Sequence, residues 1–148
     1  RAPVAAWQAG RAEEPGLERH RLAARYHERL DGLPFVRAVP GQRRAGSAHH
    51  LFPVVFDVEG LGMSKKDLLD TFFSRRIRCQ VHYTPLHRLP AFADIGPRLT
   101  TSFTTVDTAF PGLVSLPLWR GMTDDDCDRV ADAVAGIVHG STHARGRA

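Results

Sequence analysis

The chain has 148 residues, of which 43% are hydrophobic and 24% charged, with a formal net charge of +4. This length suits one domain with its own hydrophobic core. No apolar run approaches the roughly 18 residues that a membrane span needs, and the N-terminus lacks the apolar core of a signal peptide. The sequence therefore excludes a membrane partner, and we expect a cytoplasmic location.

The positive charge does not indicate nucleic-acid binding. A binding surface for single strands combines a basic groove with aromatic side chains on which bases stack. Here the basic residues are scattered without alternating aromatics, and we interpret them as solvated helix faces and a frayed tail. The basic segments are Arg19–Arg29, Arg43–Arg44, Arg75–Arg78 and Arg145–Arg147.

Metal-ligand and disulfide patterns are absent from the sequence. Cys79 and Cys127 are the only cysteines and are too far apart to form a zinc motif, so we expect two buried thiols. The histidines at 49, 50, 82 and 87 match no compact ligand spacing either. We therefore expect no metal.

The first half of the chain predicts a helix and two strands. Residues 1–16 have no sustained period and are expected to be an irregular leader. Apolar residues recur at helical spacing over residues 17–30, before Asp31-Gly32 ends the helix. Leu33–Val39 contains Pro34 and is followed by Pro40, so it predicts an edge strand or an extended segment, and His50–Val58 predicts a buried strand. Pro53 within it should require an edge position or a bulge.

A second helix and a third strand follow without a long loop. Ser64 and Asp67 form the pattern of a capping box. The apolar positions 68, 69, 72, 73 and 77 then predict one buried helical stripe. Arg78–Tyr83 predicts a strand, in which Cys79 and Val81 should point into the core.

The last third predicts a short helix over Phe103–Phe110, a strand over Leu113–Leu118 and a final helix. Thr123 should cap that helix, and Asp124–Asp126 should favour its dipole. We expect Gly140 to end it, with residues 141–148 as a disordered tail. The elements together indicate an α/β (α+β-like) domain over residues 17–140, with a small mixed or antiparallel sheet covered by helices.

The most informative stretch is 77–90, Ile-Arg-Cys-Gln-Val-His-Tyr-Thr-Pro-Leu-His-Arg-Leu-Pro. A short β-branched run ends in a polar cluster of His82, Tyr83 and His87, and Pro85 and Pro90 prevent a continuing ladder. Ligands of α/β proteins usually bind at strand ends. We therefore expect His82 and Tyr83 to be partly exposed at the tip of the strand.

Three blocks in fixed order carry a resemblance to a known family. They are His50-Leu-Phe-Pro-Val-Val-Phe, the His82-Tyr-Thr-Pro-Leu-His block with its strand, and Leu113-Val-Ser-Leu-Pro-Leu followed by Thr123-Asp. The chain resembles the C-terminal small domain of the DegT/StrS family of sugar aminotransferases, which are fold-type-I enzymes that use pyridoxal 5′-phosphate. The resemblance implies amino transfer from glutamate or glutamine to a keto-sugar nucleotide. It also implies that His82 and Tyr83 contact the substrate, with His87 in support.

The family's cofactor lysine has no counterpart here. Lys65 and Lys66 are the only lysines, and both lie in the first turn of the second helix. We therefore expect the C-terminal portion of an aminotransferase that binds no cofactor and is inactive alone. The alternative is a non-catalytic ligand-binding or interaction domain retained without the catalytic half. In either case apolar surface on helices 17–30 and 72–77 should drive homo-oligomerisation or docking on an aminotransferase large domain.

Overall fold

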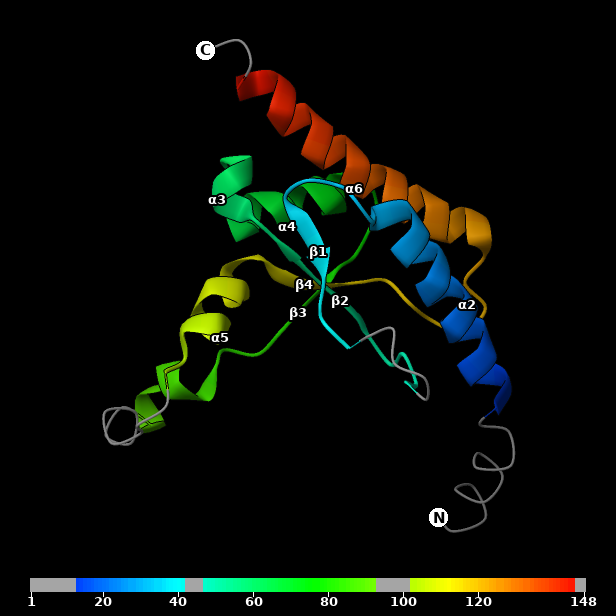
Figure 1. Cartoon of the computed structure of the whole chain (residues 1–148), viewed down its shortest axis with the longest axis horizontal. Helices are drawn as coiled ribbons and strands as arrows, with labels where there is room; N and C mark the ends of the chain where they lie inside the picture. Colours follow the sequence, from blue (N-terminus) through cyan, green and yellow to red (C-terminus); the bar gives the residue numbers. More distant parts are fainter. Residues whose placement is uncertain (1–12, 42–46, 93–101, 146–148) are drawn as a thin grey trace.

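The computed structural model describes residues 13–41, 47–92 and 102–145. Within them a single four-stranded antiparallel sheet has the order β1-β2-β4-β3 (Figure 1). This arrangement confirms the α/β expectation with an antiparallel sheet. The strands are β1 (Val36–Ala38), β2 (Phe52–Phe56), β3 (Gln80–Val81) and β4 (Leu113–Leu116).

Three helices cover one face of the sheet: α2 (Glu13–Leu30), α4 (Lys65–Ser74) and α6 (Asp124–Arg145) (Figure 1). Their buried side chains meet those of Phe52, Phe56 and Val114 in one core. The shorter elements are α3 (Val58–Leu61), η1 (Leu86–Arg88), η2 (Pro90–Phe92), α5 (Thr104–Ala109) and η4 (Phe110–Gly112). No helix in the described part of the chain is both long and apolar enough to cross a bilayer.

Two helices extend beyond their expected ends. Helix α2 begins at Glu13, inside the segment expected to be irregular, and α6 continues past Gly140 to Arg145. Ile137 and Val138 keep the last turns of α6 against the core, and the Ser141 hydroxyl donates to the Ile137 carbonyl. One glycine in a helix costs only about 1 kcal/mol, so Gly140 does not end it.

The predicted helix starts at Ser64 and Thr123 are confirmed. At α4 the Ser64 hydroxyl accepts from the Asp67 amide, and the Asp67 carboxylate accepts from the Ser64 amide. Thr123 and Asp126 form the same reciprocal pair at the start of α6. Each pair satisfies two amides that have no partner within the helix.

Strand β2 lies inside the sheet although it contains Pro53, so the expected edge position or bulge is wrong. Pro53 pairs with Ser115 of β4, and its carbonyl accepts from the Val39 amide on the other side. In an antiparallel ladder the N–H and C=O of one residue point the same way. The missing N–H of Pro53 therefore faces Val39, just beyond the last residue of β1, so the proline leaves out one bond at the end of that ladder.

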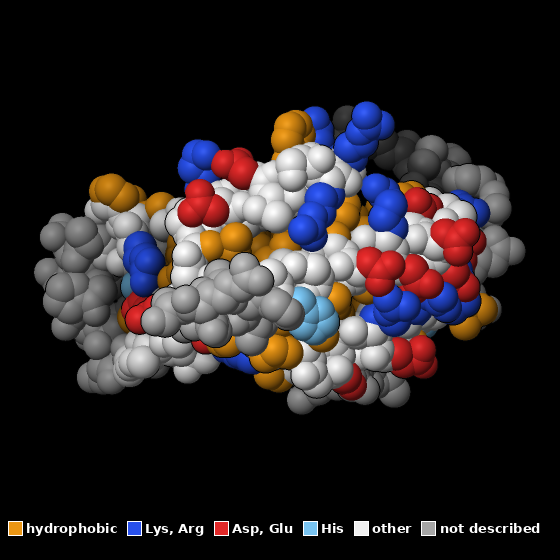
Figure 2. All heavy atoms as spheres, turned by 90° about the horizontal axis from the view of Figure 1, so that it is seen from above, with side chains coloured by type: hydrophobic (Ala, Val, Ile, Leu, Met, Phe, Trp, Pro, Cys, Tyr) orange, Lys and Arg blue, Asp and Glu red, His pale blue; other side chains and the backbone are white. Residues whose placement is uncertain are grey.

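The arginine-rich face of α2 is not merely solvated, as the sequence suggested. Arg21, Arg25 and Arg29 pair with Asp124, Asp128 and Asp132 of α6, always 103 positions apart. The constant offset means that the two helices run parallel. Figure 2 shows the acidic and basic side chains intermixed at the right-hand end of the molecule, where α2 and α6 lie together. We call these three pairs the arginine–aspartate ladder.

The apolar surface expected to drive oligomerisation is largely internal. Leu22 and Tyr26 of α2 are buried, as are Phe72 and Ile77. Phe73 was expected in the buried stripe, but its side chain is 64% exposed, because it lies one position round the helix from Phe72. Oligomerisation stays a prediction, and the contact between copies would have to use side chains other than these buried ones.

A substitution at Gly112 tests the packing between η4 and β2. A Cβ at this position would lie 1.7 Å from the Phe56 carbonyl oxygen, which is backbone and cannot rotate away. We expect Gly112→Ala to destabilise the domain by more than about 2 kcal/mol. Gly140→Ala is the matched control, since nothing lies within 4 Å of its Cβ position in α6, and it should stabilise by about 0.5–1 kcal/mol. Urea midpoints measure both, and equal midpoints would contradict the contact.

Candidate functional site

Two of the predicted site residues follow β3 directly. His82 is half-buried, and its Nε2 lies 3.0 Å from the Ser115 hydroxyl oxygen of β4. Ser115 is only 1% exposed and alternates with the core residues Val114 and Leu116. It therefore faces the side of the sheet away from the core helices. His82 thus lies over that side, while Tyr83 next to it is 99% exposed.

The predicted burial of the β3 side chains is half wrong. Cys79 is partly buried against the core, as expected, but Val81 is 59% exposed. The strand is also shorter than the predicted Arg78–Tyr83, with two residues at the outer edge of the sheet. Val81 pairs with the buried Val114, but an edge strand has a neighbour on one side only.

His87 belongs to a second polar group, formed by η1 and α5. Its Nε2 is 2.9 Å from an Asp107 carboxylate oxygen, and the Arg88 Nε donates to the same oxygen at 2.6 Å. The His87 ring also stacks on Phe103, with centroids 4.2 Å apart and planes 6° from parallel. The bonds from His87 and Arg88 hold the pKa of Asp107 below its usual range. His87 is thereby fixed in place by neighbours that the sequence does not indicate.

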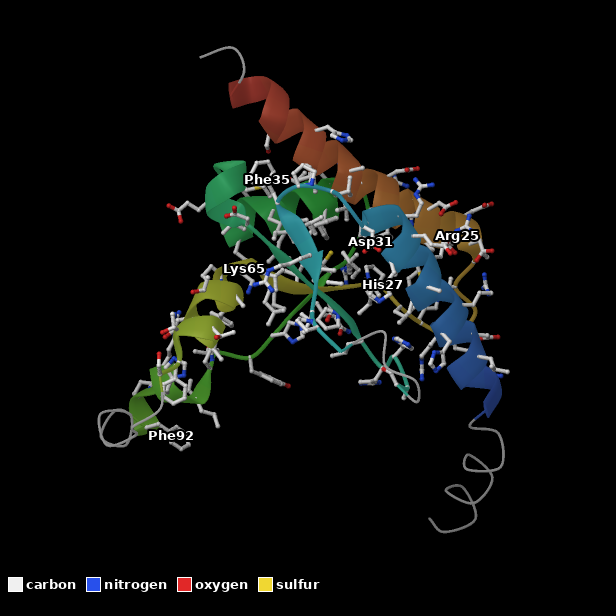
Figure 3. The ribbon with its side chains drawn as sticks, in the orientation of Figure 1. Arg25, His27, Asp31, Phe35, Lys65 and Phe92 are labelled. Carbon is white, nitrogen blue, oxygen red and sulfur yellow. The ribbon has the colours of Figure 1, made fainter. Side chains whose placement is uncertain are left out.

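Lys65 extends the site from the first residue of α4. Its ammonium donates to the Phe110 carbonyl at 2.9 Å and lies 4.4 Å from the centre of the Phe110 ring. Figure 3 shows Lys65 between α4 and the segment that joins α5 to β4. Burial lowers the pKa of Lys65. Burial also lowers the pKa of His82, and the charge of Lys65 lowers it further, so the two side chains share one electrostatic environment.

The arrangement has groups that can bind a polar ligand. A neutral imidazole both donates and accepts hydrogen bonds, a phenol donates, and an ammonium attracts anions. Burial raises the pKa of Cys79 to about 12 and that of Cys127 to about 11, so both thiols stay protonated and unreactive. In the described ranges no three His, Cys, Asp or Glu side chains gather to hold a metal.

Sequence reasoning missed three partners of the site. Ser115 gave a signal, because it is the single hydroxyl in the apolar run Leu113–Leu118. Asp107 and Lys65 gave none, since they reach the site through the chain's path in space, 20 and 17 positions from the histidines they affect.

The contacts of His82 and the exposure of Val81 predict that His82 contributes more to stability, although the strand pattern placed Val81 in the core. His82→Ala removes the described partner of the buried Ser115 hydroxyl and should cost about 1 kcal/mol. Val81→Ala trims a side chain that is mostly exposed and should cost less than about 0.5 kcal/mol. Denaturant midpoints distinguish the two. A larger loss for Val81→Ala would show that β3 is buried and that this description of the edge is wrong.

Histidine titration should make stability depend on pH. Burial and Lys65 lower the pKa of His82, and burial and His20 lower that of His49, from an ordinary value of 6.5. The unfolded chain therefore binds protons more readily than the folded one, so stability is full above about 6.5 and falls as the pH decreases through the lowered values. The loss in urea midpoint from pH 7.5 to 5 should shrink in the His82→Gln/His49→Gln variant. His139→Gln serves as the control, and an undiminished loss in the double variant would contradict the assignment.

The sequence is similar to that of a known family and of a curated protein. The sequence matches the DegT/DnrJ/EryC1/StrS aminotransferase family over residues 1–135. It is 26% identical over 137 residues to the uncharacterized protein MJ1066 of Methanocaldococcus jannaschii, covering 93% of this chain and 36% of that protein. The chain thus spans about a third of the length of the curated relative it matches.

Solved structures of sugar aminotransferases have the same fold. PseC of Helicobacter pylori, an aminotransferase of pseudoaminic acid biosynthesis, superimposes with a TM-score of 0.71 at 19% identity, over 84% of this chain and 33% of that one. DesV of S. venezuelae, solved with a ketimine intermediate, gives 0.68 at 27% identity, over 81% and 31%. Together with the match over residues 1–135, these likenesses show that the chain belongs to the DegT/DnrJ/EryC1/StrS aminotransferase family.

Proposed function

We propose that this chain forms the small-domain part of a pyridoxal-phosphate-dependent aminotransferase that acts on nucleotide-linked keto-sugars. Within it, His82 and Tyr83 would contact the sugar or its phosphates. The observation that carries the proposal is the exposed Tyr83 phenol beside an imidazole that is held by Ser115 and influenced by Lys65. The family match supports the reaction class, and the relative DesI was solved with its TDP-sugar product.

Each side chain has a distinct task in this proposal. His82 has a lowered pKa and is therefore uncharged at neutral pH, so it can accept a hydrogen bond from a sugar hydroxyl or donate one to an oxygen. Tyr83 can donate to a hydroxyl or phosphate oxygen from its exposed position. Lys65 adds a positive charge that favours a phosphate nearby. His87, held by Asp107 and Phe103, would support the segment that carries Tyr83.

The lysines present do not fit a cofactor site. A Schiff-base lysine needs a free amine that points into a pocket. Lys66 is exposed and paired with Asp70, and Lys65 donates to the Phe110 carbonyl while lying over the Phe110 ring. A relative, Spr1654 of Streptococcus pneumoniae, is known in a PLP form, and the chain covers 31% of it. The lysine and the cofactor pocket would then come from a part of the fold outside these 148 residues.

The second candidate function is a non-catalytic domain that binds the same ligands without chemistry. The observation that favours it is that neither lysine is placed to form an aldimine. Both candidates assign the polar cluster at β3 to ligand binding. They differ in whether a large domain completes the site.

The cofactor assignment predicts that the chain forms no stoichiometric adduct with pyridoxal 5′-phosphate. After incubation and borohydride reduction, peptide mapping by mass spectrometry should find only substoichiometric, scattered modification. Transaminase activity should also be undetectable. A single adduct on Lys65 at one per chain would mean that this lysine is free to react and that the site is complete without another domain.

The substrate assignment predicts where a TDP-linked amino sugar binds. In an NMR titration the amide shifts should cluster at residues 80–88 and near Lys65, with weak affinity because only part of the site is present. His82→Ala and Tyr83→Phe should each weaken binding at least fivefold. His139→Ala changes an exposed histidine on α6 and should bind like the original chain. Shifts that cluster elsewhere, or equal binding in all variants, would refute the role of the β3 tip.

A further inference from the structure

A hollow of about 810 Å³ lies where α4 ends and α6 begins. Four parts of the chain bring five arginines to it: α2, the segment after α4, the loop before α6, and α6 itself. The arginines are Arg19, Arg76, Arg78, Arg120 and Arg129. These residues are scattered in the sequence, which suggested only solvated positions, but the fold gathers them. We call this hollow the arginine groove.

The charge of the arginine groove is of one sign. The described residues that line it include no aspartate or glutamate. In the described residues none of its five arginines forms an ion pair, whereas Arg21, Arg25 and Arg29 of the neighbouring ladder are each paired with an aspartate. The Arg19 Nε is moreover buried without a described hydrogen-bond partner. The groove thus presents guanidinium groups without a direct salt bridge among the described residues, although Arg129 lies close enough to Asp126 to help lower the pKa of that carboxylate.

The lining between the arginines is mostly apolar. Leu51, Phe73 and Trp119 line the groove and are exposed by 37%, 64% and 45%. Large exposed apolar side chains with arginines around them are characteristic of protein interfaces, where Trp and Arg are enriched among the residues that contribute most binding energy. Guanidinium groups also bind carboxylates in a bidentate geometry.

We propose that the arginine groove binds an acidic segment of a protein partner, with apolar side chains on Trp119, Phe73 and Leu51 and carboxylates on the arginines. A nucleotide fits the lining less well. Its base would occupy one aromatic ring and leave the aliphatic lining uncovered. An acidic segment with alternating apolar residues uses both features. The site is separate from the polar cluster of His82 and Tyr83 and does not depend on aminotransferase chemistry.

The test uses the 148-residue chain and a fluorescein-labelled 12-residue peptide that alternates glutamate with leucine and phenylalanine. We expect anisotropy to show micromolar binding that weakens at least tenfold in Arg120→Glu and in Trp119→Ala. The matched control is Arg37→Glu on β1, an exposed arginine outside the groove with the same change of charge, and it should bind within twofold of the original. The same peptide with glutamine in place of glutamate should bind at least tenfold more weakly.

Three results would overturn the proposal. Equal weakening in Arg37→Glu and Arg120→Glu would mean diffuse attraction by net charge. Binding of ATP at the groove without binding of the peptide would make it a nucleotide site. If the unmutated chain does not bind the peptide although its circular dichroism spectrum shows that it is folded, the groove is not this interface. Arg120→Glu should leave the titration with the TDP-linked amino sugar unchanged, so the groove and the β3 site succeed or fail independently.

Discussion

The packing of α2 against α6 is the constraint on which the rest of the domain depends. Tyr26 lies in the centre of this contact, fully buried, and its hydroxyl donates to the Pro117 carbonyl at 2.8 Å. One side chain thereby ties α2 to the chain segment that leaves β4 and turns into α6. Desolvation raises the pKa of Tyr26, so the phenol stays protonated and donates this bond at neutral pH. At the surface of this contact the arginine–aspartate ladder joins the two helices, and Figure 3 shows Arg25 beside α6.

The two faces of the four-stranded sheet have different roles. The face toward α2, α4 and α6 carries the core, and the other face carries Ser115 and receives His82. Because β3 is an edge strand of two residues, the chain leaves the sheet immediately after Val81. The chemistry-bearing residues therefore lie where the backbone is no longer confined by a neighbouring strand. Such a position suits ligand contact and contributes little to the core.

Local signals were predictable from the sequence, whereas features made by distant segments were not. The capping boxes at Ser64 and Thr123 depend on residues three positions apart, and both are present. The place of Pro53 depends on where β1 stops, which no local pattern indicates. The three-residue cluster at 82–87 was found as a set, but the structure divides it. His82 bonds to Ser115 of β4 and His87 to Asp107 of α5, and both partners come from later in the chain.

The ladder has a further consequence for how the two helices find their alignment. Arg25 lies 2.6 Å from Asp128 and 3.8 Å from Asp124, and Arg29 is 3.9 Å from Asp128 in addition to its pair with Asp132. If α2 slid by four residues, about 6 Å along the helix, two of the three arginines would still meet an aspartate. Charge attraction therefore favours the observed alignment over these alternatives by only one pair. The buried Tyr26 adds to this preference, because a shift of about 6 Å would break the hydrogen bond from its hydroxyl to the Pro117 carbonyl.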